Sequence, residues 1–367
     1  MTPQPSPHPA ARPAPHPLRF SYGTNGLTDL RLDDALSLLA DLGYDGVGLT
    51  LDHMHLDPFA PDLAARTRRL ARRLDELGLG VTLETGARYV LDPRRKHGPS
   101  LLDPDPEQRA RRVDLLIRAV RVAEELGAHA VHCFSGVLPK ERSGARDAPA
   151  EIPGHTVPED VLADARDDAA RDGAPDGGTG GADDATNDGT AEDIAWKRLA
   201  EALTPVVDAA TAAGVPLAVE PEPGHLLATL DDFHRLRTSL GSPDALGLTL
   251  DIGHCQCLEP RSPADCVREA APWLRHVQIE DMRRGVHEHL PLGDGEIDFP
   301  PVLEALAAAG YPGLVSVELP RHSHAGPRFA QQSLPFLRRA APALVPRDAG
   351  GPAVPGEGTN ASEERTP

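Results

Sequence analysis

The sequence predicts a single (β/α)₈ TIM barrel, an α/β fold in which eight parallel strands close on themselves inside a ring of helices. Short β-rich runs alternate with helical patterns along the chain, and this alternation calls for a parallel sheet. Eight such units favour a closed barrel over an open, doubly wound sheet. Because no Gly-x-Gly-x-x-Gly motif follows the first run, a dinucleotide-binding sheet is the weaker choice.

The predicted strands are short, and several of them end in an acidic residue. In chain order they are Leu18–Tyr22, Gly46–Leu51, Gly80–Glu84, Ala130–Phe134, Pro216–Glu220, Leu246–Asp251, His276–Glu280 and Leu314–Glu318. Helical patterns fill the gaps, for example at Leu32–Leu42, Leu63–Leu77, Arg109–Leu126, Trp196–Ala213 and Pro301–Ala309. Glycine just past a helix, followed by an apolar strand, is typical of helix-to-strand connections, and Gly43, Gly78, Gly127 and Gly310 follow this pattern.

Three segments lie outside the predicted barrel. Residues 1–17 are rich in Pro and His, residues 346–367 are rich in Gly, Pro and Glu, and residues 142–192 form an acidic Asp/Gly/Ala/Thr stretch. Such compositions cannot bury enough apolar surface to offset the entropy of ordering, so we expect two disordered tails and a disordered insertion after the fourth strand. The insertion is either a solvated linker or a lid or partner-binding element. The barrel domain then spans 18–345 and, without the insertion, has about 275 residues, close to the usual size.

Composition and charge narrow the class of protein. A hydrophobic content of 40% is enough for a substantial core, and the net charge of −19 argues against nucleic acid as a partner. No apolar run approaches the length of a membrane span, and the first residues do not resemble a signal peptide, so a cytoplasmic protein without a membrane partner is the default expectation. The four cysteines lack Cys-x-x-Cys spacing, which indicates neither a disulfide scaffold nor a zinc knuckle.

The ends of the predicted strands carry the residues that could take part in catalysis or metal binding. Active-site residues of a barrel lie where strands end and the following loops begin. A single acid there could be a helix N-cap, as for Asp251 or Asp281. Carboxylates that converge on one mouth repel each other unless they hold a cation or share a proton, so Glu220, Asp251 and Glu318 together predict a metal site.

The accompanying histidines bear on which metal the site would take. An oxygen-rich set with one nitrogen suits Mg²⁺ or Mn²⁺, whereas several histidines favour Zn²⁺ or Co²⁺. Both tendencies are present, because His254 follows Asp251 by three residues and His287 and His289 follow the seventh strand. The predicted cofactor is therefore a divalent ion, with Mn²⁺, Mg²⁺, Co²⁺ and Zn²⁺ all open.

Five phrases at these strand ends resemble the xylose isomerase-like TIM-barrel superfamily, the family of sugar phosphate isomerase/epimerases, ketose 3-epimerases, inosose-processing enzymes and endonuclease IV, also called AP endonuclease family 2. The phrases are Val219–Pro223, Leu250–His254, His276–Asp281, Pro291–Asp298 and Gly313–Glu318. The resemblance implies that Glu220, Asp251, residue 278 and Glu318 hold the metal and that His254 contacts a substrate oxygen. This chain has Gln278 where the family has a histidine, so Gln278 itself or His276, His287 or His289 would supply the remaining donor.

The predicted activity is that of a metal-dependent isomerase or epimerase acting on a small sugar, sugar phosphate or cyclitol. Glu220 and Glu318 would remove and return a proton next to a carbonyl that the metal polarises. His254 would hold a substrate hydroxyl or the developing oxyanion. Further candidates for contact with a small polyhydroxylated substrate are Glu84, Arg88, His132, Arg284 and His289.

Two alternatives remain at this stage. A zinc phosphodiesterase of the endonuclease IV kind would need several metals and a basic face, and the acidic balance and Gln278 argue against it. A barrel that binds a metabolite or partner without turnover would explain Gln278, whereas the three strand-end acids favour an enzyme. A homo-oligomer stays open, as do dehydratase and lyase chemistry, which begin with the same proton abstraction.

Overall fold

The computed structural model describes residues 17–138 and 190–341, and it confirms the predicted closed barrel of eight parallel strands. The barrel strands are β1 (Arg19–Gly23), β2 (Gly46–Thr50), β3 (Gly80–Glu84), β4 (Val131–Phe134), β5 (Leu217–Glu220), β6 (Leu246–Asp251), β7 (Leu274–Ile279) and β10 (Leu314–Val317). Their order around the barrel is β1-β10-β7-β6-β5-β4-β3-β2, so β1 closes the ring against β10. Each predicted strand therefore lies within two residues of its observed bounds at either end.

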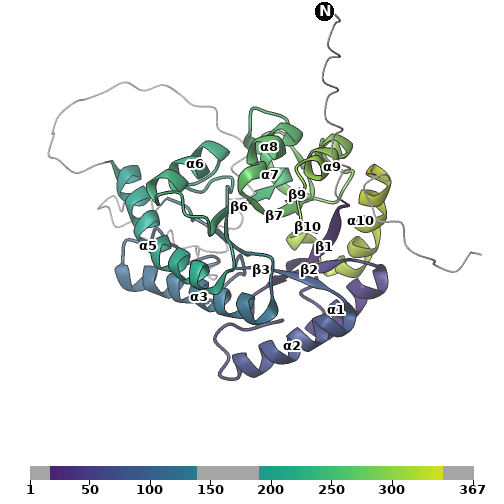
Figure 1. Ribbon diagram of the computed structural model, residues 1–367, viewed down its shortest axis with the longest axis horizontal. Helices are drawn as coiled ribbons and strands as arrows, with labels where there is room; N and C mark the ends of the chain where they lie inside the picture. The colour runs from purple at the N-terminus through teal and green to yellow at the C-terminus, as the bar shows by residue number, and fades with distance from the viewer. Residues whose placement is uncertain (1–16, 139–189, 342–367) are drawn as a thin grey trace, which may run out of the picture.

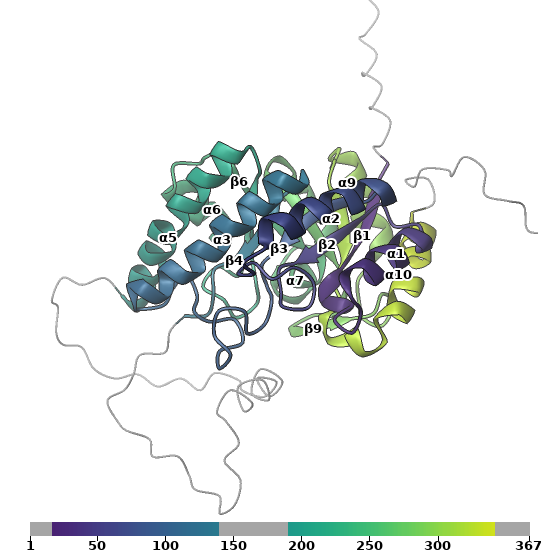
Figure 2. The same ribbon diagram turned by 90° about the horizontal axis from the view of Figure 1, so that it is seen from below.

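Helices surround the strands, as Figures 1 and 2 show from two directions. The α-helices described are α1 (Leu32–Leu42), α2 (Leu63–Leu77), α3 (Pro106–Leu126), α5 (Ala191–Ala213), α6 (Leu230–Ser239), α7 (Ile252–Leu258), α8 (Pro263–Ala270), α9 (Phe299–Ala308) and α10 (Gly326–Ala340). Short 3₁₀ turns are η1 (Thr24–Gly26), η2 (Ala271–Trp273) and η3 (Pro320–Ala325). No helix in the described residues is long and apolar enough to span a membrane.

Glycine ends the helices that precede strands, as predicted. Gly43 after α1 and Gly78 after α2 have φ values of 84° and 67°, in the left-handed region that side chains with a Cβ rarely adopt. The Gly43 amide donates to the carbonyls of Ala40 and Leu39, which would otherwise lack partners at the end of the helix. The chain can then turn directly into the next strand.

Alternation along the strands separates an apolar layer from a polar interior. Val277 and Ile279 on β7 are fully buried in the hydrophobic core that the helices cover. The intervening His276 and Gln278 are also buried, and the His276 imidazole reaches across the barrel to the Glu84 carboxylate on β3, 3.3 Å away. The odd and even positions of β7 therefore face opposite sides, and the side toward the barrel axis is polar.

One helix begins before its predicted start. Helix α5 begins at Ala191, before the predicted start at Trp196, because Thr190 and Asp193 form a reciprocal capping box at its first turn. The end of the predicted acidic insertion therefore lies within this helix. The remainder of the insertion, from residue 142 to residue 189, and all but residue 17 of the tails lie outside the described residues.

A hairpin that the sequence analysis did not predict follows β7. It consists of β8 (Asp281–Arg283) and β9 (Val286–Leu290), joined at Arg284 and Gly285. The Asp281 carboxylate accepts hydrogen bonds from the backbone amides of Met282, Gly293 and Ile297, which fixes the base of the hairpin and the loop after it. Asp281 is therefore not the helix N-cap that the sequence allowed, because it begins a strand and binds backbone amides of the hairpin and the loop after it.

Candidate active site

Carboxylates and imidazoles from several strands converge at the carboxyl ends of the barrel strands. The acids are almost inaccessible, since Glu220, Asp251 and Glu280 expose 3%, 1% and 0% of their surface. Charged groups buried this deeply are costly unless opposite charges, hydrogen-bond donors or a metal ion compensate them. The partners of each carboxylate therefore indicate what the site is built to hold.

Glu220, the last residue of β5, lies between two histidines. His132 Nε2 on β4 is 2.5 Å from Glu220 Oε2, and His254 Nδ1 on α7 is 3.3 Å from Glu220 Oε1. Burial acts to raise the pKa of Glu220, but the charges and hydrogen bonds of His132 and His254 outweigh it and hold the pKa well below its usual range. This carboxylate is therefore ionised, with an imidazole at each oxygen.

Asp251, the last residue of β6, has two separate tasks. Its Oδ1 accepts a hydrogen bond from the His254 amide at 2.7 Å and caps the N-terminus of α7. This is the helix N-cap role that the sequence left open. Its buried Oδ2 accepts no hydrogen bond from any described residue. The helix cap thus aims the second oxygen at the mouth and positions His254 beside it.

A second cluster lies around Glu280, immediately after β7. His289 Nδ1 on β9 is 3.7 Å from Glu280 Oε1 and 4.0 Å from Glu318 Oε2. One potential ligand atom from each of Asp251, Glu280, His289 and Glu318 lies within 4.8 Å of all the others. Burial, followed by the charges of neighbouring carboxylates, raises the pKa of both Glu280 and Glu318 well above the usual range. The repulsion among these acids is the property that a cation would relieve.

Two further groups could also bind a metal. They are His254 with His287 and His289, and Glu220 with Glu222 and His254. Glu222 is less buried and lies 3.7 Å from His287 Nε2; burial raises the pKa of its carboxyl to about 8. His254 and His289 each belong to two of the groups, so the mouth offers overlapping sets of donors.

The structure does not bring every predicted site residue to this mouth. Glu84 lies inside the barrel against His276, and Gln278 is 1% exposed with no hydrogen bond to its Oε1 among the described residues. Arg88 is exposed on the loop after β3. Arg284 is exposed at the hairpin turn, where its guanidinium donates to the Glu259 backbone carbonyl. Within the described part of the chain, neither arginine forms a hydrogen bond or ion pair with the acids at the mouth.

Two residues in the site, Glu280 and Asn25, have no role in the prediction from the sequence. Glu280 was visible only as part of a strand-end phrase, although its even spacing from His276 and Gln278 puts all three on one face of β7 and its extension. Asn25 on η1 donates from Nδ2 to Glu318 Oε1 at 2.8 Å, and nothing in the local sequence marks it. The spacing of β7 could have identified Glu280, whereas Asn25 required the closure of β1 on β10.

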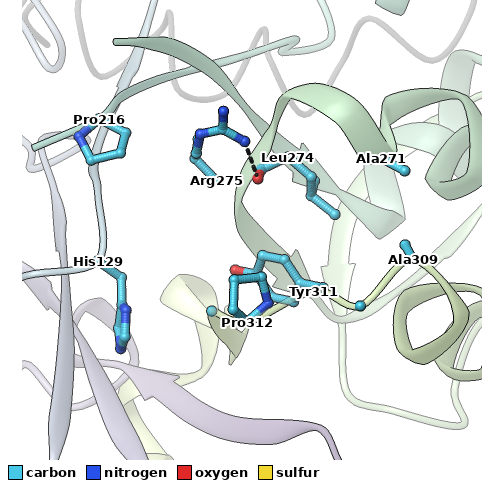
Figure 3. Close-up of a pocket in the computed structure, with 10 residues that line it drawn as sticks. His129, Pro216, Ala271, Leu274, Arg275, Ala309, Tyr311 and Pro312 are labelled. Carbon is cyan, nitrogen blue, oxygen red and sulfur yellow. Dashed lines mark hydrogen bonds between the residues drawn. The ribbon is translucent and has the colours of Figure 1, made fainter. Parts of the chain in front are cut away.

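A cavity of about 340 Å³ lies at the opposite end of the barrel. Figure 3 shows the side chains that line it. Its lining includes His129, Pro216, Leu274 and Arg275, which immediately precede or begin β4, β5 and β7, together with the Ala309–Gly313 turn before β10. Residues at the amino ends of barrel strands serve stability, whereas catalysis takes place at the carboxyl ends. The cavity is therefore separate from the candidate active site.

Comparisons with known proteins agree with this architecture. An L-ribulose 3-epimerase from Mesorhizobium japonicum is 26% identical over 290 residues, which are 78% of this chain and 75% of that protein. An inosose dehydratase from Lacticaseibacillus casei is 29% identical over 143 residues, 34% of this chain, and the match spans about half, 47%, of that relative. The solved structure of the IOLI protein with a zinc atom matches with a TM-score of 0.59 at 17% identity, covering 89% of this chain and 98% of that one. A family model described as xylose isomerase-like TIM barrel matches residues 36–172 and 177–340, and the chain belongs to this family.

Proposed function

We propose that the protein is a metal-dependent isomerase or epimerase of a small sugar or cyclitol. The observation that carries the proposal is the convergence of Glu220, Asp251 and Glu318 with His254 at one barrel mouth. Relatives of this chain include an L-ribulose 3-epimerase and an inosose dehydratase, whose names supply the substrate class. Polyhydroxylated carbonyl compounds suit a mouth lined with carboxylates and imidazoles, because each hydroxyl can find an acceptor or a donor.

The residues at the mouth fit a divalent ion, since buried carboxylate oxygens and imidazole nitrogens that lack hydrogen-bond partners are the donors such ions use. When bound, the ion would polarise the substrate carbonyl and make the neighbouring C–H more acidic. A zinc atom in the IOLI structure supports the presence of a metal in this fold, and Mn²⁺, Mg²⁺ and Co²⁺ also suit the donors.

Glu220 and Glu318 are the residues that we propose to move the proton. They end β5 and follow β10, which β6 and β7 separate in the barrel, so they approach a bound ligand from different sides. One carboxylate removes the proton, and the other returns it on another face or carbon. His132 holds one Glu220 oxygen, Asn25 holds one Glu318 oxygen, and His254 is positioned to bind a substrate hydroxyl.

The test is a substrate screen in which products are identified by NMR. The protein, loaded in turn with each of the four metals, is incubated with ketopentoses, ketohexoses and inososes. We expect conversion of at least one to an epimer or isomer, a loss of about 10²-fold or more for Glu220→Gln and Glu318→Gln, and no loss for the exposed-surface control Glu201→Gln. Loss of water from an inosose instead of epimerisation would indicate a dehydratase, and no conversion of any compound would contradict the proposal.

A further inference from the structure

Glu280 is a buried carboxylate that the metal set implied by the family resemblance does not include. It is 0% exposed, and neither of its oxygens accepts a hydrogen bond from a donor in the described residues. One oxygen of Glu280 and one of Asp251 lie within 4.8 Å of each other, and His289 Nδ1 lies 3.7 Å from Glu280 Oε1. Buried carboxylates this close to each other are costly unless a proton or a cation compensates them.

The chain makes room for this carboxylate with a glycine. A Cβ on Gly253, in the first turn of α7, would lie 2.0 Å from Glu280 Oε1 and 2.8 Å from the Met282 methyl group. Gly253 does not have a positive φ, so the helix itself does not require glycine there, and glycine weakens a helix relative to alanine. The close approach of Glu280 explains the residue.

Three potential ligands surround Glu280 from different elements. Asp251 Oδ2 at the end of β6 accepts no hydrogen bond in the described residues and lies 3.9 Å from His254 Nε2. His289 reaches in from β9 with Nδ1 3.7 Å from Glu280, and Glu318 follows β10 with Oε2 4.0 Å from His289. Two ligand atoms each about 2.1 Å from one ion lie roughly 3 to 4.2 Å apart. The two distances from His289, 3.7 and 4.0 Å, fall in this range, and all four ligand atoms lie within 4.8 Å of one another, so small side-chain movements would close the set on an ion.

We propose that Asp251, Glu280, His289 and Glu318 hold the divalent ion, with Glu280 and His289 taking the places of Glu220 and Gln278 in the expected set. The proposal deepens the proposed function, on which it rests only for the role of the ion in the reaction. Gln278 lies two residues before Glu280 on the same face, which places it about 6.6 Å lower along the strand. The Glu280 carboxylate, two residues nearer the mouth, then compensates for the glutamine that stands at 278 in place of the family's histidine.

This assignment leaves Glu220 free of the ion. Its two oxygens lie 2.5 and 3.3 Å from the imidazoles of His132 and His254, whereas Glu280 has one imidazole, that of His289, at the longer distance of 3.7 Å, and neither Glu280 oxygen accepts a hydrogen bond in the described residues. An acid already neutralised by two imidazoles gains less from a cation than an uncompensated one. Glu220 therefore keeps its proton-transfer role, and the ion lies nearer to Glu280 and the hairpin.

The experiment measures metal binding by the full-length chain after removal of bound metal. Mn²⁺ binding is followed by the EPR signal of free Mn²⁺, and Co²⁺ binding by its visible absorption. We expect one strong site, a fall in affinity of at least about 10²-fold for Glu280→Gln and His289→Gln, and a change of less than about threefold for the control Gln278→Met. The Co²⁺ absorption of any residual complex should change for His289→Gln, because a nitrogen ligand is lost.

Thermal unfolding separates metal loss from misfolding. In EDTA, Glu280→Gln should unfold at the same or a higher temperature than the native chain, because one of several mutually repelling carboxylates is gone, while the rise in Tm on adding Mn²⁺ disappears. Retained Mn²⁺ affinity in Glu280→Gln, or loss of affinity in Gln278→Met, would overturn the assignment and indicate that Glu280 is a protonated partner of Asp251. Both readouts are independent of turnover, so strong Mn²⁺ binding at these residues without conversion of any sugar would contradict only the proposed function.

Discussion

Asp251 and Gly253 show how single residues at the start of α7 shape the site. One Asp251 oxygen caps the helix at the His254 amide and the other faces the cluster of acids, so helix formation and ligand placement depend on the same side chain. Two residues later, Gly253 permits the Glu280 carboxylate to pack against the helix backbone. The absence of a Cβ at Gly253 thus determines where the Glu280 carboxylate can lie.

Gly253→Ala should reduce stability even though alanine is the better helix former. The new Cβ would collide with Glu280 and Met282, and overpacking of a buried site costs about 1–3 kcal/mol. Urea unfolding in EDTA checks this, together with the Glu280→Ala variant and the double variant. In the Glu280→Ala background the cost of Gly253→Ala should largely vanish; an undiminished cost would show that Glu280 is not the group that requires the glycine.

The β8–β9 hairpin is the element on which His287 and His289 depend. Strand pairing does not join the hairpin to the barrel, because β8 and β9 form their own two-stranded sheet. Asp281 instead anchors it through three backbone amides, from Met282, Gly293 and Ile297. Further contacts hold the turn of the hairpin, where the Gly285 amide donates to the Cys257 carbonyl and Arg284 to the Glu259 carbonyl. The position of the two histidines therefore depends on Asp281 at the base of the hairpin and on these contacts at its turn.

Replacing Asp281 with alanine should unfold the hairpin from its base. Three buried or partly buried amides lose their acceptor, which would cost about 2–4 kcal/mol and weaken Mn²⁺ binding through displacement of His289. Urea denaturation measures the stability and EPR the metal affinity. The exposed neighbour Asp294→Ala is the control, expected within about 0.5 kcal/mol of the native chain; equal effects of the two substitutions would refute the anchoring role.

For the whole molecule, a partly buried neutral histidine makes the fold sensitive to acid. His97, on the loop between β3 and α3, packs against the Phe134 ring with centroids 5.6 Å apart. Burial, then the charges of Lys96 and Arg112, lowers its pKa to about 3. The unfolded chain binds a proton near pH 6.5 whereas the folded chain does not, so this histidine removes stability as the pH falls from 6.5 towards 3.

His97→Phe should therefore make the protein more resistant to acid. At pH 5, protonation of His97 in the unfolded chain lowers the free energy of unfolding by roughly 2 kcal/mol, and the variant does not have this loss. Urea unfolding of both proteins at pH 5 and pH 8 isolates the effect, since any packing change appears at both pH values and cancels. A stability difference between the two proteins that does not change with pH would show that His97 is protonated in the folded state.

The barrel was predictable from the sequence, and the arrangement of the mouth only in part. Alternating strand and helix patterns with glycine at helix ends fix the order of the elements, so all eight strands were found. Glu220, Asp251 and Glu318 were expected at the mouth because the active-site residues of a barrel lie where its strands end, and the structure places them there, while their roles stay predictions. The hairpin, the Asn25 contact and the packing of Gly253 on Glu280 depend on contacts between distant segments, which local patterns do not encode.

The central claim, proton abstraction next to a carbonyl at this mouth, is tested most directly by solvent deuterium incorporation. The metal-loaded protein would be incubated in D₂O with L-ribulose and with an inosose, and deuterium at the carbon beside the carbonyl followed by NMR and mass spectrometry. We expect incorporation into at least one compound, lost when Glu220 and Glu318 are both replaced by Gln and unchanged in Glu201→Gln. Absence of deuterium from both compounds, or undiminished incorporation with the double variant, would show that these carboxylates do not move the proton.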